Sequence, residues 1–236
     1  MALSTKDLQG GASSVKKTIA PGNHRLKINS VNLETFKFIE NAYHLVLNVE
    51  TEPLKDFEGF LIDSDNPDSG RYNGQVGKVT ASRYAFADGE TKSGIKVERD
   101  RSILVFLKTL SKNLDFANDS ETFTKWFTDQ DGEHETIEEF VEAFDKVINK
   151  EEKVYLDFCI GGREWENKNG YINYNLFLVK PQKGKYSITT PDSKALVKFD
   201  SDDSQHLIRL VVKNVESFGD DDISIPSNTS NDFSLD

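Results

Sequence analysis

Alternation along the chain predicts β-strands in its first and last parts. In the segment 43–49, Tyr43, Leu45, Leu47 and Val49 fall on one face, and the residues between them fall on the other. A period of two is typical of a strand that buries one face. The predicted strands are residues 25–29, 43–49, 58–63, 72–86, 154–160 and 172–178, followed by a less regular pair at 195–199 and 206–215.

The middle of the chain changes to a helical period. Apolar residues recur every three or four positions over 103–114, and a shorter helix is predicted over 120–127. Thr136 and Glu139 form a capping box, which opens a third helix whose apolar stripe runs over 137–148. We expect the acids of this third helix to face outward; they are Glu138, Glu139, Glu142 and Asp145.

The order of these elements indicates the fold class. Three or four strands precede a helical insertion at about 101–150, and a hairpin with an Asn-Lys-Asn-Gly turn at 167–170 follows it. We therefore predict a mainly β fold with a helical insertion (α+β), namely an OB-like five-stranded barrel with helices between strands 3 and 4. Any other small mixed barrel or sheet with a helical insertion fits the same pattern.

The length of 236 residues and mass of 26.6 kDa fit one globular unit with appendages. Residues 1–23 are rich in Gly, Ser and Lys and are predicted to be a flexible leader, residues 24–218 the OB-like domain, and residues 219–236 a disordered tail. No apolar run approaches the roughly 18 residues that span a bilayer, and the N-terminus lacks the apolar core of a signal peptide. We expect no membrane contact and a cytoplasmic location.

Charge is distributed unevenly. The net charge of -11 would disfavour nucleic acid if it were spread over the whole surface. Residues 129–152 hold ten acids and two bases, however, and residues 220–236 hold five acids and no base. The rest of the chain has 27 bases against 25 acids. A nearly neutral body with an acidic tail is typical of an interaction tail.

Few residues have the spacing that catalysis requires. The single cysteine, Cys159, excludes an internal disulfide and is expected to be a core thiol, and the four histidines are dispersed. The glycine-rich run 70–77 lacks the Gly-Lys-Ser/Thr end of a phosphate loop. The acids over 63–68 are interrupted by Pro67, which occupies a ligand position of a calcium loop. We expect no enzymatic activity, no cofactor and no metal site.

Two segments combine aromatic and basic residues, which is the combination that holds single-stranded nucleic acid. Residues 71–101 carry seven bases against four acids, and the predicted hairpin after residue 160 adds a tryptophan and further bases. The alternative is that these rings belong to the core, as Tyr174 would because it shares a face with Ile172 and Leu176. The candidate nucleic-acid-binding residues are Tyr72, Lys78, Arg83, Tyr84, Lys92, Lys96, Arg99, Arg163, Trp165, Lys168 and Tyr171.

The segments 154–178 and 72–80 resemble single-stranded DNA-binding proteins of tailed bacteriophages. The segment 220–226, Asp-Asp-Asp-Ile-Ser-Ile-Pro, is similar to the acidic tip of bacterial single-stranded DNA-binding proteins, in which acids precede an Ile-Pro-Phe end. The chain departs from that pattern because ten residues follow Pro226.

The resemblance implies a protein that coats and protects single-stranded DNA during phage replication or recombination in the host cytoplasm. It also implies that the acidic tail recruits a polymerase, helicase or primase, and self-association as a homo-oligomer is compatible with it. The tail residues that would bind such partners are Asp220, Asp221, Asp222, Asp232, Phe233 and Asp236.

Two other classes of protein remain open. A phage virion or assembly protein would use the helices and the tail for protein contacts alone. An enzyme of DNA metabolism with acidic metal ligands is the third alternative.

Overall fold

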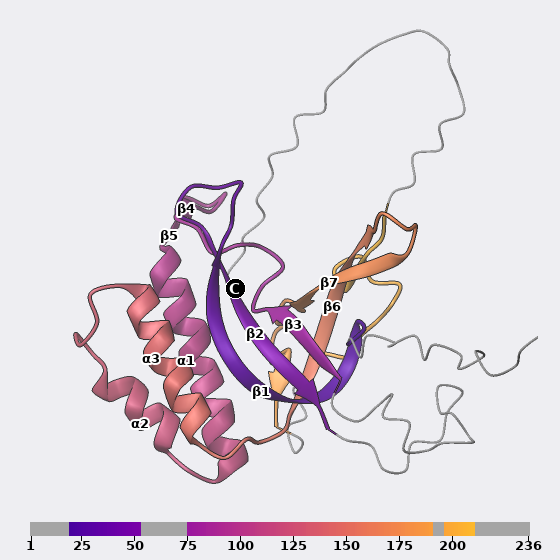
Figure 1. The fold of residues 1–236 in the computed structure, drawn as a ribbon. Coiled ribbons are helices and arrows are strands. Elements are labelled where there is room, and N and C mark those ends of the chain that lie inside the picture. Colours follow the sequence, from indigo (N-terminus) through magenta and orange to yellow (C-terminus); the bar gives the residue numbers. More distant parts are fainter. Residues whose placement is uncertain (1–18, 53–74, 191–195, 211–236) are drawn as a thin grey trace, which may run out of the picture.

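The computed structural model describes residues 19–52, 75–190 and 196–210. Among these residues, five strands close a β-barrel (Figure 1). In barrel order they are β1 (Gly22–Thr35), β2 (Tyr43–Thr51), β3 (Val76–Thr80), β7 (Ile172–Leu178) and β6 (Leu156–Glu166). Closure occurs because β1 pairs with β6 at its start and with β2 along the rest. Neighbouring strands are antiparallel except β3 and β7, which are parallel. The prediction of a mainly β barrel with helices is confirmed.

Long aliphatic and aromatic side chains fill the barrel. Leu26, Leu47 and Phe158 are completely buried there and come from three different strands. The pairing of β1 with β2 shifts register between Ile28 and Ser30, and an irregularity of this kind bends a strand. This bend allows β1 to pair with β6 at its start and with β2 farther along, which closes the barrel.

The helices of the described part, α1 (Arg99–Asn118), α2 (Thr122–Asp129) and α3 (Ile137–Lys150), form a layer on one side of the barrel (Figure 1). They confirm the helices expected over 103–114, 120–127 and 137–148. No helix of this part combines the length and apolar character needed to cross a membrane.

The capping box of α3 is present, since Thr136 Oγ1 accepts a hydrogen bond of 3.2 Å from the Glu139 amide. The expectation that all four acids of α3 face outward is wrong for Glu138 and Asp145. Asp145 Oδ1 accepts a 2.7 Å hydrogen bond from the Val31 amide, and Glu138 Oε1 accepts one of 2.5 Å from Tyr43 Oη. These two carboxylates therefore fasten α3 to β1 and β2.

Three predicted strands differ from those observed. In the described residues the segment 72–86 is a strand only over β3. After β3 the chain turns, because the Thr80 hydroxyl donates to the Ser82 carbonyl and the Ser82 hydroxyl accepts from the Tyr84 amide. In the predicted strand 195–199, the described residues 196–199 contribute a single bridge, between Leu196 and Tyr186. The late strand is confined to β9 (Leu207–Ile208) in the part that is described.

Short strands complete the described part. β4 (Gly89–Glu90) and β5 (Lys96–Val97) make a small hairpin next to α1, and β8 (Ile188–Thr189) pairs with β6. Ile19 is buried and β1 begins at Gly22, so the expected leader 1–23 overlaps the start of the barrel. The predicted strand 58–63 and the acidic tail lie outside the described residues.

Candidate nucleic-acid interface

The hairpin of β6 and β7 places an exposed tryptophan beside an arginine. Asn167 Oδ1 accepts hydrogen bonds from the amides of Asn169 and Tyr171, at 2.9 and 3.0 Å, and Gly170 closes the turn with a φ of 78°. This is the turn predicted from the Asn-Lys-Asn-Gly sequence. Because side chains alternate along β6, Trp165 and Arg163 lie on the same face, opposite Asn173 and Asn175 of β7.

The same face continues across β3 and β2. Val79 and Leu176 are buried inside the barrel, so Lys78 of β3 lies on the outside with Arg163 and Trp165. On β2, His44, Val46 and Asn48 alternate with Leu45 and Leu47 of the barrel core and so lie outside, although Val46 is itself buried. We call this surface the outer face; it comprises His44, Asn48, Lys78, Asn173, Asn175, Arg163 and Trp165. Figure 1 shows β2 and β3 running diagonally across the barrel and the β6–β7 hairpin extending from it toward the upper right.

His44 is a half-buried member of the outer face and pairs with Glu34 near the end of β1. Burial lowers the pKa of His44, and the Arg163 guanidinium contributes to the lowering, whereas Glu34 opposes both effects. Its Nδ1 atom is buried and has no hydrogen-bond partner among the described residues. Since β2, β3, β7 and β6 pair in that order, Arg163 and His44 lie on the same side of one sheet.

The cations of the outer face are free to change partners. Lys78 Nζ lies 2.8 Å from Glu34 Oε1, but both side chains are well exposed, at 68% and 46%. An exposed ion pair of this kind contributes only about 0–1 kcal/mol. A phosphate could therefore replace Glu34 at little cost.

The connection between β1 and β2 adds aromatic rings that sequence analysis missed. Phe38 is 88% exposed, and its ring packs edge-on against Phe36 with centroids 5.4 Å apart. Phe36 in turn contacts His44 at 5.0 Å, so these rings border the outer face. The signal was available in the sequence, because Phe36, Phe38 and Ile39 interrupt an otherwise polar segment between two strands.

Of the candidate residues, the structure brings Lys78, Arg163, Trp165, Lys168 and Tyr171 together on or next to the outer face. Lys168 and Tyr171 lie in and after the hairpin turn, where both are exposed. Tyr174 is on the opposite face of the hairpin and 37% exposed.

Arg83 and Tyr84 follow β3 and lie near the segment that leads into β9, a strand that pairs with β6 at Gly162 and Arg163. The Arg83 guanidinium lies over the Tyr84 ring at 5.3 Å, and its Nη1 donates to Gln205 Oε1 at 3.3 Å. The two residues therefore line the side of the barrel on which β9 lies.

Lys92, Lys96 and Arg99 lie at the β4–β5 hairpin and the start of α1, at upper left in Figure 1. The Arg99 guanidinium packs on the Tyr43 ring at 4.8 Å, pairs with Asp100 at 2.6 Å and donates to the Asn41 carbonyl at 2.9 Å. Arg99 thus joins α1 to the end of the β1–β2 connection. Lys96 pairs with Glu98 at 3.4 Å.

Tyr72 and the tail residues Asp220, Asp221, Asp222, Asp232, Phe233 and Asp236 lie outside the described residues. Cys159 is buried, as expected for a core thiol, and burial raises its pKa to about 12. Within the described ranges, no three His, Cys, Asp or Glu side chains are grouped so that they could hold a metal ion.

Comparisons of the chain with protein-family models, with curated proteins and with solved structures found no match. What the protein does must therefore be inferred from its own surface.

Proposed function

We propose that the barrel is an OB-fold and that its outer face binds single-stranded DNA without chemistry of its own. The helices lie in the chain between β5 and β6, and OB-folds bind oligonucleotides on the face of their second and third strands and on two flanking loops. In this chain the corresponding elements are β2 and β3, the β1–β2 connection and the β6–β7 turn.

One observation carries the proposal: exposed aromatic rings lie next to weakly paired cations on one continuous surface. Trp165 is 43% exposed beside Arg163, and Phe38 borders the same face through Phe36 and His44. Stacking of bases on such rings tolerates any sequence, and the cations follow the phosphates. Duplex DNA offers no unstacked bases to these rings.

In the proposed role the protein coats and protects DNA in phage replication or recombination. Its acidic tail would recruit a polymerase, helicase or primase and would compete with DNA for the cations of the outer face. The resemblance of the tail to the acidic tip of bacterial single-stranded DNA-binding proteins supports this part.

The test is a fluorescence titration of the full chain with oligothymidine and with duplex DNA over a series of salt concentrations. Trp126 packs against Phe140 and Phe144 in the helical layer, so a Trp126→Phe variant leaves Trp165 as the reporter. We expect quenching by the single strand, an affinity that falls with salt, and weak duplex binding.

Trp165→Ala should weaken binding by about 1–3 kcal/mol, the contribution of one stacked base. Tyr186→Ala is the matched control, because Tyr186 is 50% exposed on the β7–β8 connection and not part of the outer face. Equal affinity for duplex and single strand, or an unchanged affinity in Trp165→Ala, would refute the proposal.

A further inference from the structure

One side of α1 exposes apolar and basic residues where a helix normally carries only polar ones. Arg101, Val105, Lys112 and Phe116 recur at spacings of four, seven and four residues, which places them along one side of the helix. Val105 is 59% exposed and Phe116 is 66% exposed, although the buried stripe of α1 lies on the opposite side. We call these four residues the α1 stripe.

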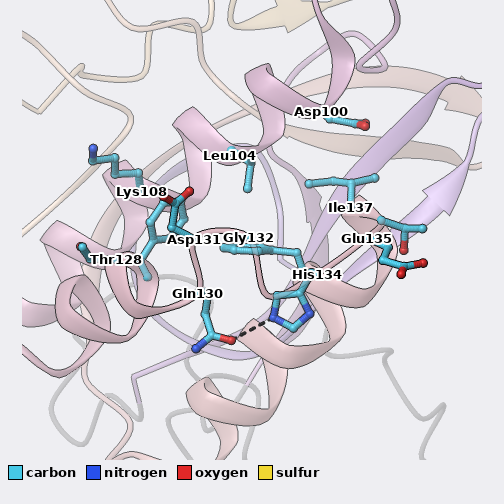
Figure 2. Close-up of a pocket in the computed structure, with 13 residues that line it drawn as sticks. Asp100, Leu104, Lys108, Thr128, Gln130, Asp131, Gly132, His134, Glu135 and Ile137 are labelled. Carbon is cyan, nitrogen blue, oxygen red and sulfur yellow. Dashed lines mark hydrogen bonds between the residues drawn. The ribbon is translucent and has the colours of Figure 1, made fainter.

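A groove of about 450 Å³ lies beside the α1 stripe, between α1 and the connection from α2 to α3 (Figure 2). Leu104, Phe127, Ile137 and Phe140 give it apolar walls, and His134 is held in place by a 2.9 Å hydrogen bond to Gln130. Asp131 and Glu135 also line the groove and are both exposed, and Lys108 of α1 lies beside Asp131 in Figure 2. The groove therefore suits an apolar side chain that is flanked by positive charges.

Several charged side chains on this side of the molecule make no ion pair with another residue that the structure describes. Among the described residues, neither the bases Arg101, Lys108 and Lys112 nor the acids Asp131 and Glu135 take part in an ion pair. Bases and acids lie side by side, on α1 and on the α2–α3 connection respectively. A two-fold rotation of a second copy would bring the bases of each copy to the acids of the other.

We propose that two copies of this chain form a dimer in which the α1 stripe of each copy lies against the groove of the other. Phe116 and Val105 are the apolar anchors, and the ion pairs between the copies set the orientation. A second copy of the chain is the occupant, because the same face of the molecule carries both the basic α1 stripe and the groove with its acids. The inference does not depend on DNA binding, and the outer face stays open because the helices lie on the other side of the barrel in Figure 1.

The experiment is sedimentation velocity of the full chain without DNA, at low salt, over about 1–100 µM protein, since dimerisation follows protomer concentration. We expect the unchanged chain to shift from monomer to dimer. Phe116→Ser should raise the dimer dissociation constant by about tenfold or more, which corresponds to losing one buried aromatic anchor.

Two charge-reversed chains make the test specific. In the first chain, Arg101→Glu with Lys112→Glu reverses the α1 stripe, so that stripe and groove are both acidic. In the second chain, Asp131→Lys with Glu135→Lys reverses the groove, so that stripe and groove are both basic. Each chain alone should stay monomeric by repulsion, whereas an equimolar mixture should form a heterodimer. Lys37→Glu with Lys168→Glu is the matched control, because it reverses two exposed cations on the barrel loops and should leave the dimer intact.

Circular dichroism of each variant establishes that it is folded. An unchanged chain that is monomeric at every concentration overturns the proposal, as does a dimer that survives both charge reversals. A mixture that fails to associate while the unchanged chain dimerises also overturns it, because the dimer then uses another surface.

Discussion

At the scale of single residues, exposure separates rings that stabilise the barrel from rings that are free to bind. Phe158 is completely buried between strands, whereas Phe38 keeps 88% of its surface in water and packs edge-on against the Phe36 ring. Removing an exposed ring costs little stability, because little apolar area was buried by folding. Such a ring can be tested for function without loss of the fold.

Phe38→Ala should therefore weaken oligothymidine binding by about 1–3 kcal/mol and leave the midpoint of thermal unfolding nearly unchanged. The measurements are a binding isotherm at fixed salt and a thermal melt by circular dichroism. Tyr186→Ala again serves as the control for loss of an exposed ring. A Phe38→Ala chain with normal DNA affinity would exclude the β1–β2 connection from the interface.

His44 makes folding stability depend on pH. Because burial lowers the pKa of His44 in the folded protein, the unfolded chain takes up a proton at higher pH than the folded chain does. The contribution of neutral His44 to folding stability is therefore complete above about pH 6.5, which is the pKa of histidine in the unfolded chain. It decreases as the pH falls below that value. His24, whose pKa burial also lowers, acts in the same direction.

We expect the unfolding midpoint of the unchanged chain to fall more steeply between about pH 7.5 and pH 5 than that of His44→Gln, which has no proton to take up. Chemical denaturation at a series of pH values measures this difference. Parallel pH profiles for the two chains would contradict the assigned effect.

At the scale of elements, the glycines Gly161 and Gly162 of β6 make room for the segment that precedes β9. A Cβ atom on Gly161 would lie 2.5 Å from the Phe177 ring and 2.7 Å from the His206 carbonyl oxygen. The His206 carbonyl also accepts a 2.9 Å hydrogen bond from the Gly162 amide. The Gly-Gly pair therefore lets the segment before β9 approach the barrel closely.

Gly161→Ala should lower the free energy of unfolding by about 2 kcal/mol or more, because a fixed carbonyl and a buried ring must both shift. Gly89→Ala is the control: nothing lies within 4 Å of the added Cβ, and the change should stay within about 0.5 kcal/mol. Urea denaturation of both variants compares them directly. Equal stability of the two would show that the segment before β9 moves aside freely.

At the scale of the whole molecule, opposite charges are separated between regions. The outer face carries Lys78 and Arg163, the α2–α3 region is acidic, and residues 220–236 add five acids without a base. A tethered acidic segment reaches a cationic surface of its own molecule at high effective concentration. Under the proposed function, the tail and DNA are competitors.

Deletion of residues 219–236 should tighten binding to single-stranded DNA at low salt and abolish recruitment of replication partners, with folding unchanged. The gain in affinity should shrink as salt rises, because salt screens the competing contact as well. Isotherms of the full and shortened chains over a salt series measure this effect. If the isotherms of the two chains were identical at every salt concentration, the tail would not compete with DNA.

Local spacing was enough to predict many elements of this protein. A run such as Ile137 to Ile148 has to be helical to bury its apolar stripe, and the Asn-Lys-Asn-Gly turn has to reverse the chain, so both follow from neighbouring residues alone. The aromatic and basic content of the hairpin was likewise visible, which is why Trp165 and Arg163 could be named before their positions were known.

Contacts between distant residues decided the rest. Closure depends on β1 pairing with both β2 and β6, and no local period encodes a partner more than a hundred residues away. For the same reason the sequence did not reveal that Arg99 packs on Tyr43 or that Glu138 and Asp145 hold α3 to the barrel. Phe38 became a candidate only when folding placed its ring, through Phe36, beside His44.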